Sequence, residues 1–328
     1  MRALTTPIAI IALWVGTTAA AQGGAFDGSW AALIPPQDGC NGTSIMTLTM
    51  SGAVFQGQTR NPGNTEAFSG AVDADGSGTF IVYPRSSGTI RFTTDHFDAN
   101  WNDGRCRRHA LGDRALTAGE AAAAYTQRKQ SQTQYAELTR KATAGDRSVD
   151  FSLLRALYPF TDQWDPYGNK TAALLDQAAA ASKGKDCPIA MQKLDAVLKL
   201  DFTIDAAHAL LSDCLAATGS QAAAKIESDI ADGLIHSLMD SGDGNTEATA
   251  YVVTTQREEL DVLANRHLVL KLRETQIRGS NGRLYDEVQA TAAQDGQNVK
   301  TVYFDVSSFA NGRKSRMAAI ETLTASMP

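Results

Sequence analysis

A helical pattern ends and a strand begins within GLIHSLMDSGDGNTEATAYVV, residues 233–253. Large apolar residues recur at every fourth position up to and into this stretch, at Ile226, Ile230, Leu234 and Leu238. That spacing places them on one face of a helix. Ser241–Gly244 then supplies glycines and short polar side chains, which favour a turn over continued helix. The stretch therefore predicts helices before it and strands after it.

Asp240–Glu247 superficially resembles a calcium-binding loop. Loops of the EF-hand type place oxygen ligands at alternate positions at their start. Here Gly242 stands at the second ligand position. In the similar segment Asp73–Gly76, the twelfth loop position is Pro84 rather than glutamate. Both segments are interpreted as turns, and no metal site is predicted.

Residues 148–239 are predicted to be helical, in five segments. These segments are 149–158, 171–182, 188–200, 204–217 and 221–239. The last three, with their short connections, resemble a tetratricopeptide-type helical hairpin followed by one more helix. A helical solenoid needs three or more repeats, and about one is visible here. We therefore expect a packed helical layer rather than an extended array.

Residues 250–307 return to a strand pattern, with a short helix at 257–265. Helices on one face of an antiparallel sheet make an α+β domain over residues 148–307. Some apolar strand residues are expected to face the helices, namely Tyr251, Val253, Val269, Leu272, Val288, Val302 and Phe304. Residues 308–328 are predicted to form a frayed tail.

Residues 22–114 are predicted to form an all-β barrel or sandwich. Seven short apolar or alternating runs lie between residues 29 and 101, separated by turn signals. A helix over 117–144 follows, and Thr117 and Glu120 have the spacing of a capping box. Because this helix has few large apolar residues, residues 115–147 are interpreted as a partly solvated helical linker.

Residues 1–21 are typical of a secretory signal peptide. Arg2 precedes an apolar run at Ile8–Val15, and Ala19 and Ala21 suit a cleavage site after residue 21. The run is shorter than the roughly 20 residues that a membrane span needs, and no second candidate follows. We expect a periplasmic or secreted protein with no transmembrane segment after cleavage.

The chain is acidic, with a net charge of −6 at pH 7. Cleavage would remove Arg2 and no acidic residue, which takes the charge to −7. Binding to nucleic acid depends on clustered Lys and Arg. A nucleic-acid partner is therefore not expected, and an unknown protein or envelope component is the partner class that remains.

The four cysteines suit an oxidising compartment. Of the three possible pairings, the positions favour Cys40 with Cys106 and Cys187 with Cys214. The midpoint of Cys187 and Cys214 falls at the expected turn between two helices, so the two residues should lie side by side in an antiparallel hairpin. A bond closing this loop would add roughly 3–4 kcal/mol of stability. The alternative is a pair of buried free thiols.

Several motifs resemble those of one bacterial protein family. They are Asp150–Arg155, Asp165–Gly168, the turn and strand at 241–253, Tyr285–Val288 and Thr301–Val306. Together they resemble an uncharacterised secreted family, domain of unknown function 4919, over about residues 148–307. The sequence departs from the family pattern at 248–250, which affects the turn there. No activity comes with the resemblance, so the positions of unknown role that it marks are Asp165, Tyr167, Gly242, Asp243, Gly244, Glu247 and Tyr251.

The sequence holds none of the common motifs for zinc proteases, serine hydrolases, dinucleotide binding or nucleotide phosphates. His208 and His236 lie in predicted helices and are interpreted as satisfied core or boundary residues. Arg105, Arg107 and Arg108 form a denser group, in which Arg105 and Arg107 would share one strand face and could hold an anion. The alternative is a charged edge that limits strand pairing. No catalytic residue and no cofactor is predicted.

Three functions follow as hypotheses. The favoured one is a non-enzymatic exported binding or interaction module, because export and paired cysteines are predicted without a catalytic motif. The alternative is a cell-envelope enzyme of hydrolase type, with a site between the helical layer and the C-terminal sheet. A weaker third hypothesis is an apolar ligand inside the barrel.

Overall fold

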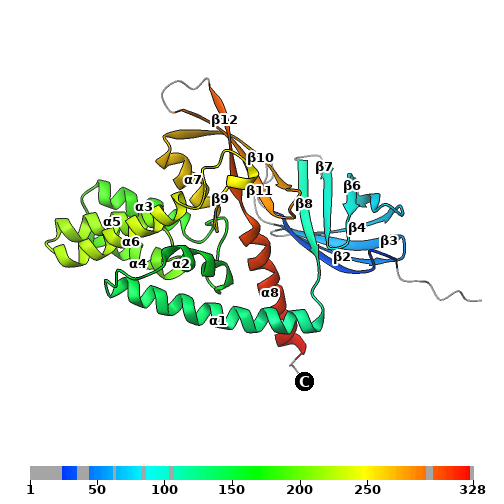
Figure 1. The fold of residues 1–328 in the computed structure, drawn as a ribbon, viewed down its shortest axis with the longest axis horizontal. Helices are drawn as coiled ribbons and strands as arrows, with labels where there is room; N and C mark the ends of the chain where they lie inside the picture. Colours follow the sequence, from blue (N-terminus) through cyan, green and yellow to red (C-terminus); the bar gives the residue numbers. More distant parts are fainter. Residues whose placement is uncertain are drawn as a thin grey trace, which may run out of the picture. The chain divides into compact units, whose positions relative to one another are not determined.

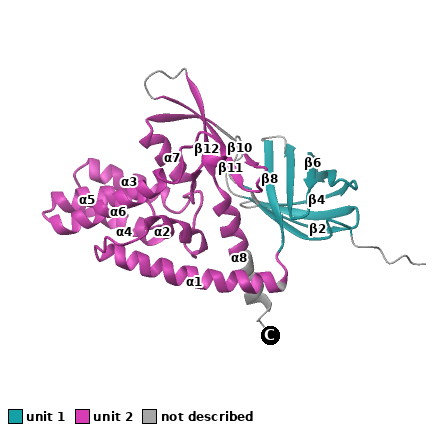
Figure 2. Ribbon diagram, viewed as in Figure 1, with its two compact units in different colours: residues 1–115 teal, residues 116–328 magenta. Residues whose placement is uncertain are grey.

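The computed structural model describes residues 24–34, 44–61, 64–82, 86–102, 107–292 and 298–325. The chain divides into two compact units, Met1–Ala115 and Leu116–Pro328, shown in Figure 2. The predicted signal peptide, Cys40, Cys106 and Arg105 lie outside the described residues. The proposals that rest on them stay predictions.

The first unit is a closed barrel of eight strands (Figure 1). The strands are β1 (Gly28–Ile34), β2 (Ser44–Ser51), β3 (Val54–Asn61), β4 (Asn64–Val72), β5 (Ser77–Val82), β6 (Ser86–Phe92), β7 (His96–Asn102) and β8 (Arg107–Arg114). Each pairs antiparallel with the next, and β8 closes onto β1 with Trp30 opposite Arg114. The prediction of an all-β barrel is confirmed. The seven predicted runs omit β8, because its sequence RRHALGDR lacks an apolar alternation.

Aromatic side chains fill the interior of the barrel. Seven of them are buried, namely Trp30, Phe55, Phe68, Phe80, Phe92, Phe97 and Trp101. The rings approach the backbone so closely that a Cβ at Gly112 would collide with Phe97. An eight-stranded barrel is of a size that side chains can fill. This packing argues against the hypothesis of an apolar ligand in the barrel.

The second unit begins with a layer of helices. They are α1 (Ala118–Thr143), α2 (Phe151–Leu157), η1 (Tyr158–Phe160), α3 (Ala172–Lys183), α4 (Cys187–Leu200), α5 (Asp205–Ala217) and α6 (Gln221–Met239). The five helical segments predicted over 148–239 are confirmed. The capping box is also confirmed, because the Thr117 backbone N–H donates to Glu120 and the Glu120 N–H donates to Thr117 Oγ1. The likeness to a tetratricopeptide unit stays a prediction.

A disulfide joins Cys187, the first residue of α4, to Cys214 in α5. Their Cα atoms are 5.1 Å apart. Consecutive helices from α3 to α6 pack on one another, so the two cysteines face the same seam of the α4–α5 hairpin. The predicted pairing of Cys187 with Cys214 is confirmed, and the bond fixes the two helices against each other.

The stretch that ends α6 folds as a tight turn. The backbone N–H groups of Asp243 and Gly244 both donate to Thr249 O, at 2.9 and 2.8 Å. Gly244 has φ +66°, a conformation that glycine adopts without strain. The chain continues through η2 (Glu247–Thr249), β9 (Tyr251–Val252), α7 (Gln256–Asn265), β10 (Leu268–Arg278), β11 (Leu284–Ala292), β12 (Val299–Asp305) and α8 (Ser307–Ala325).

The C-terminal sheet is mixed rather than antiparallel, which corrects the prediction. Its strand order is β10-β11-β12-β9, and β9 runs parallel to β12 with Tyr251 opposite Phe304. Hairpin turns force neighbouring strands to be antiparallel, as for β10 to β12. No hairpin connects β9 to its neighbour β12. The chain instead leaves β9 through α7 and continues in β10, at the opposite edge of the sheet. The direction of β9 is therefore not reversed.

Two of the strand residues predicted to face the helices do not. Tyr251, Val253, Val288, Val302 and Phe304 are buried, whereas Val269 is 51% exposed and Leu272 44% exposed. Val269 pairs with Thr291 and Leu272 pairs with Gln289. Both partners lie on the face of β11 opposite to Val288, since successive strand residues alternate faces. The regular pairing at the start of β10 gives Val269 this face, and an irregularity between Leu270 and Leu272 gives it to Leu272.

The predicted tail is wrong for residues 308–325, which belong to α8 (Ser307–Ala325). Phe309 is buried against Trp164 and Tyr167, with ring centres 6.2 and 6.0 Å apart. Arg128 of α1 donates to Ser315 Oγ at 3.2 Å. Few large apolar residues lie in this segment, so its sequence carries little sign of a helix. Tertiary contacts with α1 and with the loop after η1 hold it in place.

A buried ion pair ties the helical layer to the sheet. Arg155 of α2 donates to both carboxylate oxygens of Glu258 in α7, at 2.7 and 3.1 Å, and to Val252 O in β9 at 2.7 Å. Glu258 also accepts from the backbone N–H of Thr254 at 2.6 Å. Both charged side chains are almost fully buried, at 5% and 6% exposed. One residue pair thus connects three elements.

We expect Glu258→Gln to destabilise the second unit by about 3–5 kcal/mol, because it leaves the Arg155 charge buried without a counter-charge. The exposed pair of Lys199 and Asp195 provides a control, since Lys199→Gln should cost less than about 1 kcal/mol. Urea unfolding of the two variants and the wild type measures the difference. Equal losses for both variants would contradict this account of Arg155.

Candidate functional site

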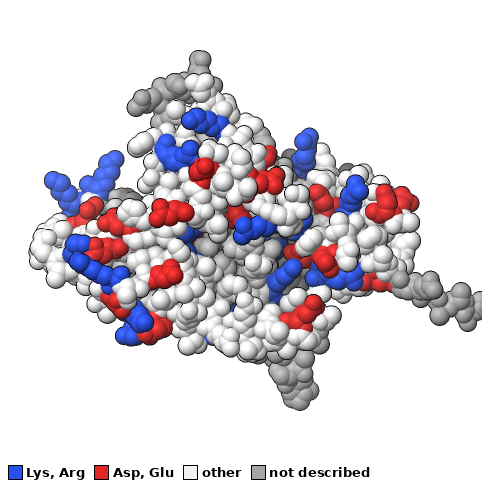
Figure 3. All heavy atoms as spheres, viewed as in Figure 1, with Lys and Arg blue, Asp and Glu red and all other residues white. Residues whose placement is uncertain are grey.

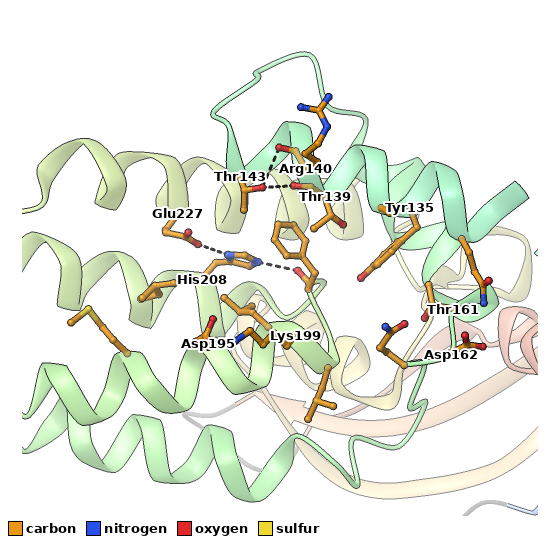
Figure 4. A pocket seen from close by; sticks show the side chains of 18 of the residues that line it. Tyr135, Thr139, Arg140, Thr143, Thr161, Asp162, Asp195, Lys199, His208 and Glu227 are labelled. Carbon is orange, nitrogen blue, oxygen red and sulfur yellow. Dashed lines mark hydrogen bonds and ion pairs between the residues drawn. The ribbon is translucent and has the colours of Figure 1, made fainter. Parts of the chain in front are cut away.

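A groove with a volume of about 920 Å³ lies within the helical layer (Figure 4). One side is formed by α1, and the other by α4 and α5, with residues 161–163 at one end and Glu227 of α6 near the floor. Known ligand sites are mostly concave and of comparable size. The groove is therefore the candidate functional site in the described part of the chain.

The α1 side of the groove is mainly polar. It consists of Gln132, Tyr135, Ala136, Thr139, Arg140 and Thr143. These positions recur at three- and four-residue intervals, which places them on one face of the helix. From its sequence, α1 is interpreted as a partly solvated linker because it has few large apolar residues. A polar groove wall has the same composition, so the sequence does not separate the two.

The opposite side of the groove is mainly apolar, although α4 also contributes the charged pair Asp195 and Lys199. Met191 and Leu198 come from α4, and Leu211 and Leu215 come from α5. Leu198 and Leu211 also pack on the core cluster between α3, α4 and α5. The disulfide between Cys187 and Cys214 joins the same two helices. The apolar wall is thus held as one unit.

His208 lies in the floor of the groove and is fully buried. Its Nδ1 lies 2.6 Å from Glu227 Oε2, and its Nε2 lies 2.9 Å from Phe202 O (Figure 4). A carboxylate oxygen and a carbonyl oxygen both accept hydrogen bonds, so each ring nitrogen of His208 faces an acceptor of the chain. Both ring nitrogens are used, as predicted for a satisfied core histidine. The exposed His236 is within hydrogen-bond distance of Asp232 O, one turn earlier in its own helix, at 2.7 Å.

A buried acid, Asp201, lies beside the groove floor. Burial raises the pKa of Asp201 to about 6, and hydrogen bonds from Thr203 oppose the shift. Its Oδ1 accepts from the Thr203 backbone N–H at 2.8 Å and from Thr203 Oγ1 at 2.6 Å. Tyr135 and Tyr158 stack nearby with ring centres 6.0 Å apart. Burial, and then the Asp201 charge, raise the pKa of both tyrosines.

Charged side chains at the rim of the groove are paired within the chain. The pairs are Arg140 with Glu137, Lys199 with Asp195, and Asp162 with Arg128. On the face drawn in Figure 3, basic and acidic residues are interspersed over the helical unit. The rim therefore presents no extended field of one sign.

The positions marked by the family resemblance fall in two separate places. Asp165 accepts from the Lys170 N–H at 2.6 Å, and Tyr167 packs on Phe309. Asp243 accepts from the Asn245 N–H at 2.9 Å, and hydrogen bonds from Thr249 and Asn245 lower its pKa.

The other four marked positions belong to the turn after α6 and to β9. A Cβ at Gly242 would collide with the backbone of 249–250, and a Cβ at Gly244 would meet the side chains of Tyr251 and Val302. A Cβ at Gly279 would meet Glu247. Tyr251 stacks beside Phe304 and beneath Arg266. None of the seven marked positions lines the groove. Their observed contacts are those of turn and core residues.

Arg107 and Arg108 point to opposite faces of β8. Arg107 is exposed, whereas Arg108 is buried and its Nη1 lies 3.4 Å from Ser44 Oγ. The two side chains therefore do not form one patch, and the anion proposal is left with Arg107 and the undescribed Arg105. Among the described residues, no group of three potential ligands could hold a metal ion. No helix in this part of the chain is long and apolar enough to cross a membrane.

We expect the contribution of Asp201 to the stability of the second unit to fall as pH rises from about 4 to about 6. The raised pKa of Asp201 means that the folded state holds its proton more tightly than the unfolded state, so unfolding becomes easier as that proton leaves. Asp201→Asn keeps an acceptor for Thr203 and should be more stable than the wild type at pH 7.5, on the order of 2 kcal/mol, but not at pH 4.5.

Urea unfolding at both pH values measures the effect. Other carboxylates also titrate in this range, with raised pKa values at Asp205 and Asp261 and lowered ones at Asp146 and Asp162. The contribution of Asp201 is therefore the difference in unfolding free energy between the variant and the wild type at each pH. The exposed Asp176→Asn serves as the control and should follow the wild type. If Asp201→Asn changes the free energy of unfolding equally at both pH values, the pKa of Asp201 is not raised by folding.

No curated protein matches the sequence. A family described as "Domain of unknown function (DUF4919)" matches residues 121–315, which is more than half of the chain. The match begins within α1 and ends within α8, so it is wider than the span of 148–307 that the motifs indicate. It takes in the helix that forms the polar wall of the groove. The chain therefore belongs to the DUF4919 family, through its second unit.

Proposed function

We propose that this protein is an exported, non-enzymatic binding module whose ligand site is the groove between α1 and the α4–α5 hairpin. The groove itself is the observation that carries the proposal. It joins a polar wall to an apolar wall, and the apolar wall is braced by a disulfide. Binding sites commonly combine an apolar lining with a few placed polar groups.

The contacts of the polar groups support binding over catalysis. A general base needs a lone pair directed at its substrate. The ring nitrogens of His208 are directed at Glu227 and Phe202 instead, and Asp201 is directed at Thr203. The marked residues Asp165 and Asp243 are bonded to the backbone of their own turns. These groups serve the fold in the described structure.

Export is part of the proposal. The pattern of residues 1–21 supports it, and so does the bond between Cys187 and Cys214, because stable disulfides are rare in reducing compartments. The net charge of −6 supports a partner other than nucleic acid.

Filling the groove should abolish binding. Ala136 is an exposed α1 residue within the groove, and Ala123 is an exposed α1 residue outside it. We expect the immobilised wild type and Ala123→Trp to retain the same component from a cell-envelope extract, and Ala136→Trp to lose it. Quantitative mass spectrometry of the eluates measures retention. If Ala136→Trp retains what the wild type retains, the groove is not the binding site.

Export is tested by fractionation of a bacterial host that makes the full chain or a chain lacking residues 2–21. We expect the full chain outside the cytoplasm, processed near residue 21 and without reactive thiols, and the shortened chain in the cytoplasm with reactive thiols. Immunoblotting, N-terminal sequencing and thiol labelling provide the readouts. An unprocessed full chain in the cytoplasm would overturn this part of the proposal.

A further inference from the structure

We infer that the groove holds an extended segment of polypeptide, with its backbone along α1 and alternate apolar side chains against α4 and α5. This inference rests on the proposed function and names the class of ligand. The two walls of the groove differ in chemistry, and an extended peptide is a ligand that differs in the same way. Its backbone offers hydrogen bonds in the plane of the chain, while its side chains project to either side at every second residue.

The dimensions of the polar wall suit a short peptide. From Gln132 to Thr143 the helix rises about 16 Å, at about 1.5 Å per residue. An extended chain covers that distance in about five residues, at about 3.3 Å each. Thr139 and Thr143 are one helical turn apart, about 6 Å. Backbone groups on one side of an extended chain repeat about every 6.6 Å, so successive groups meet successive turns of α1.

Thr139 supplies a hydrogen-bonding group that the described structure leaves without a partner. Its Oγ1 is buried and has no hydrogen-bond partner among the residues that the structure describes. The hydroxyl of the other groove threonine on α1, Thr143, instead donates to the backbone oxygens of Thr139 and Arg140 at 2.7 and 3.1 Å. A buried hydroxyl without a partner costs free energy. Because Thr139 lines the groove, a peptide N–H or C=O bound there can supply the missing partner.

The apolar wall accepts side chains rather than one fixed shape. Leu198, Leu211 and Leu215 offer branched apolar surface, and Met191 adds an unbranched thioether that adapts to its neighbour. The peptide residues that face this wall are therefore expected to be apolar. The peptide residues that face solvent can be of any type.

Two other occupants fit these walls less well. An acyl chain with a carboxylate head needs a cation, yet Arg140 and Lys199 are already paired with Glu137 and Asp195. Its apolar tail would also leave the polar wall unsatisfied. A helical ligand bonds its own backbone groups internally, so it offers only side chains to Thr139. The geometry points to an extended chain.

A phage-displayed library of random twelve-residue peptides tests the inference. Selection on the immobilised mature protein is expected to enrich sequences with apolar residues at alternate positions. Peptides enriched on the wild type should bind Ala123→Trp equally and Ala136→Trp at least ten-fold more weakly. Failure to enrich any peptide, or enrichment that Ala136→Trp does not affect, overturns the inference.

The best synthetic peptide then reports the binding mode by calorimetry. Thr139→Val should weaken it about five-fold, as expected for one hydrogen bond, whereas Thr133→Val, an exposed position outside the groove, should not. N-methylation of the peptide at successive residues should weaken binding at every second position only. Equal sensitivity at all positions, or an unchanged affinity for Thr139→Val, contradicts an extended backbone along α1.

The ligand class and the proposed function can fail separately. If sodium dodecanoate binds the wild type but not Ala136→Trp while no peptide is enriched, the ligand is an acyl chain and the groove remains a binding site. If a helical peptide is selected instead, only the extended mode is wrong. If neither the library nor the envelope extract yields a ligand that depends on Ala136, both proposals fall.

Discussion

The second unit depends on a charge taken out of water and matched inside the protein. Burying one ion without a partner costs several kcal/mol, so Arg155 and Glu258 must meet in one geometry. That geometry includes the carbonyl of Val252 and the N–H of Thr254, which lie on either side of the end of β9. The helical layer can therefore dock on the sheet in one register. The groove is formed by helices of that layer, so the positions of its walls also depend on this docking.

The role of α1 follows from what packs on its other faces. Tyr135 and Leu138 join the cluster that includes Leu154, Phe202 and Ile230, while α8 lies along a further part of the helix. A helix supported on two sides presents its remaining face without needing large apolar residues of its own. Small and polar residues on that face leave room for a ligand. The helix α1, which the sequence predicts to be a linker, is thus one wall of the candidate site.

Local patterns predicted much of this fold. The four-residue spacing of Ile226, Ile230 and Leu234 marks α6, and the symmetric placement of Cys187 and Cys214 about one turn predicts their bond. Features set by distant contacts were not predictable in this way. The helix α8 depends on Trp164 and on Arg128, and β8 is held by strands on both sides rather than by its own alternation. The exposure of Leu272 depends on an irregularity in the pairing of β10 that no residue type in this segment indicates. The groove combines residues from four helices, so no single segment of sequence contains it.

The paired charges at the groove rim also bear on how a ligand arrives. Unmatched charge of one sign steers a partner from beyond contact distance and makes its association rate depend on salt. Arg140, Lys199 and Asp162 are each neutralised by a neighbour in the chain. The rim itself therefore adds little to the steering of a ligand, and any dependence of the association rate on salt should come from the net charge of −6. Discrimination among ligands of similar charge then depends mainly on their dissociation rates.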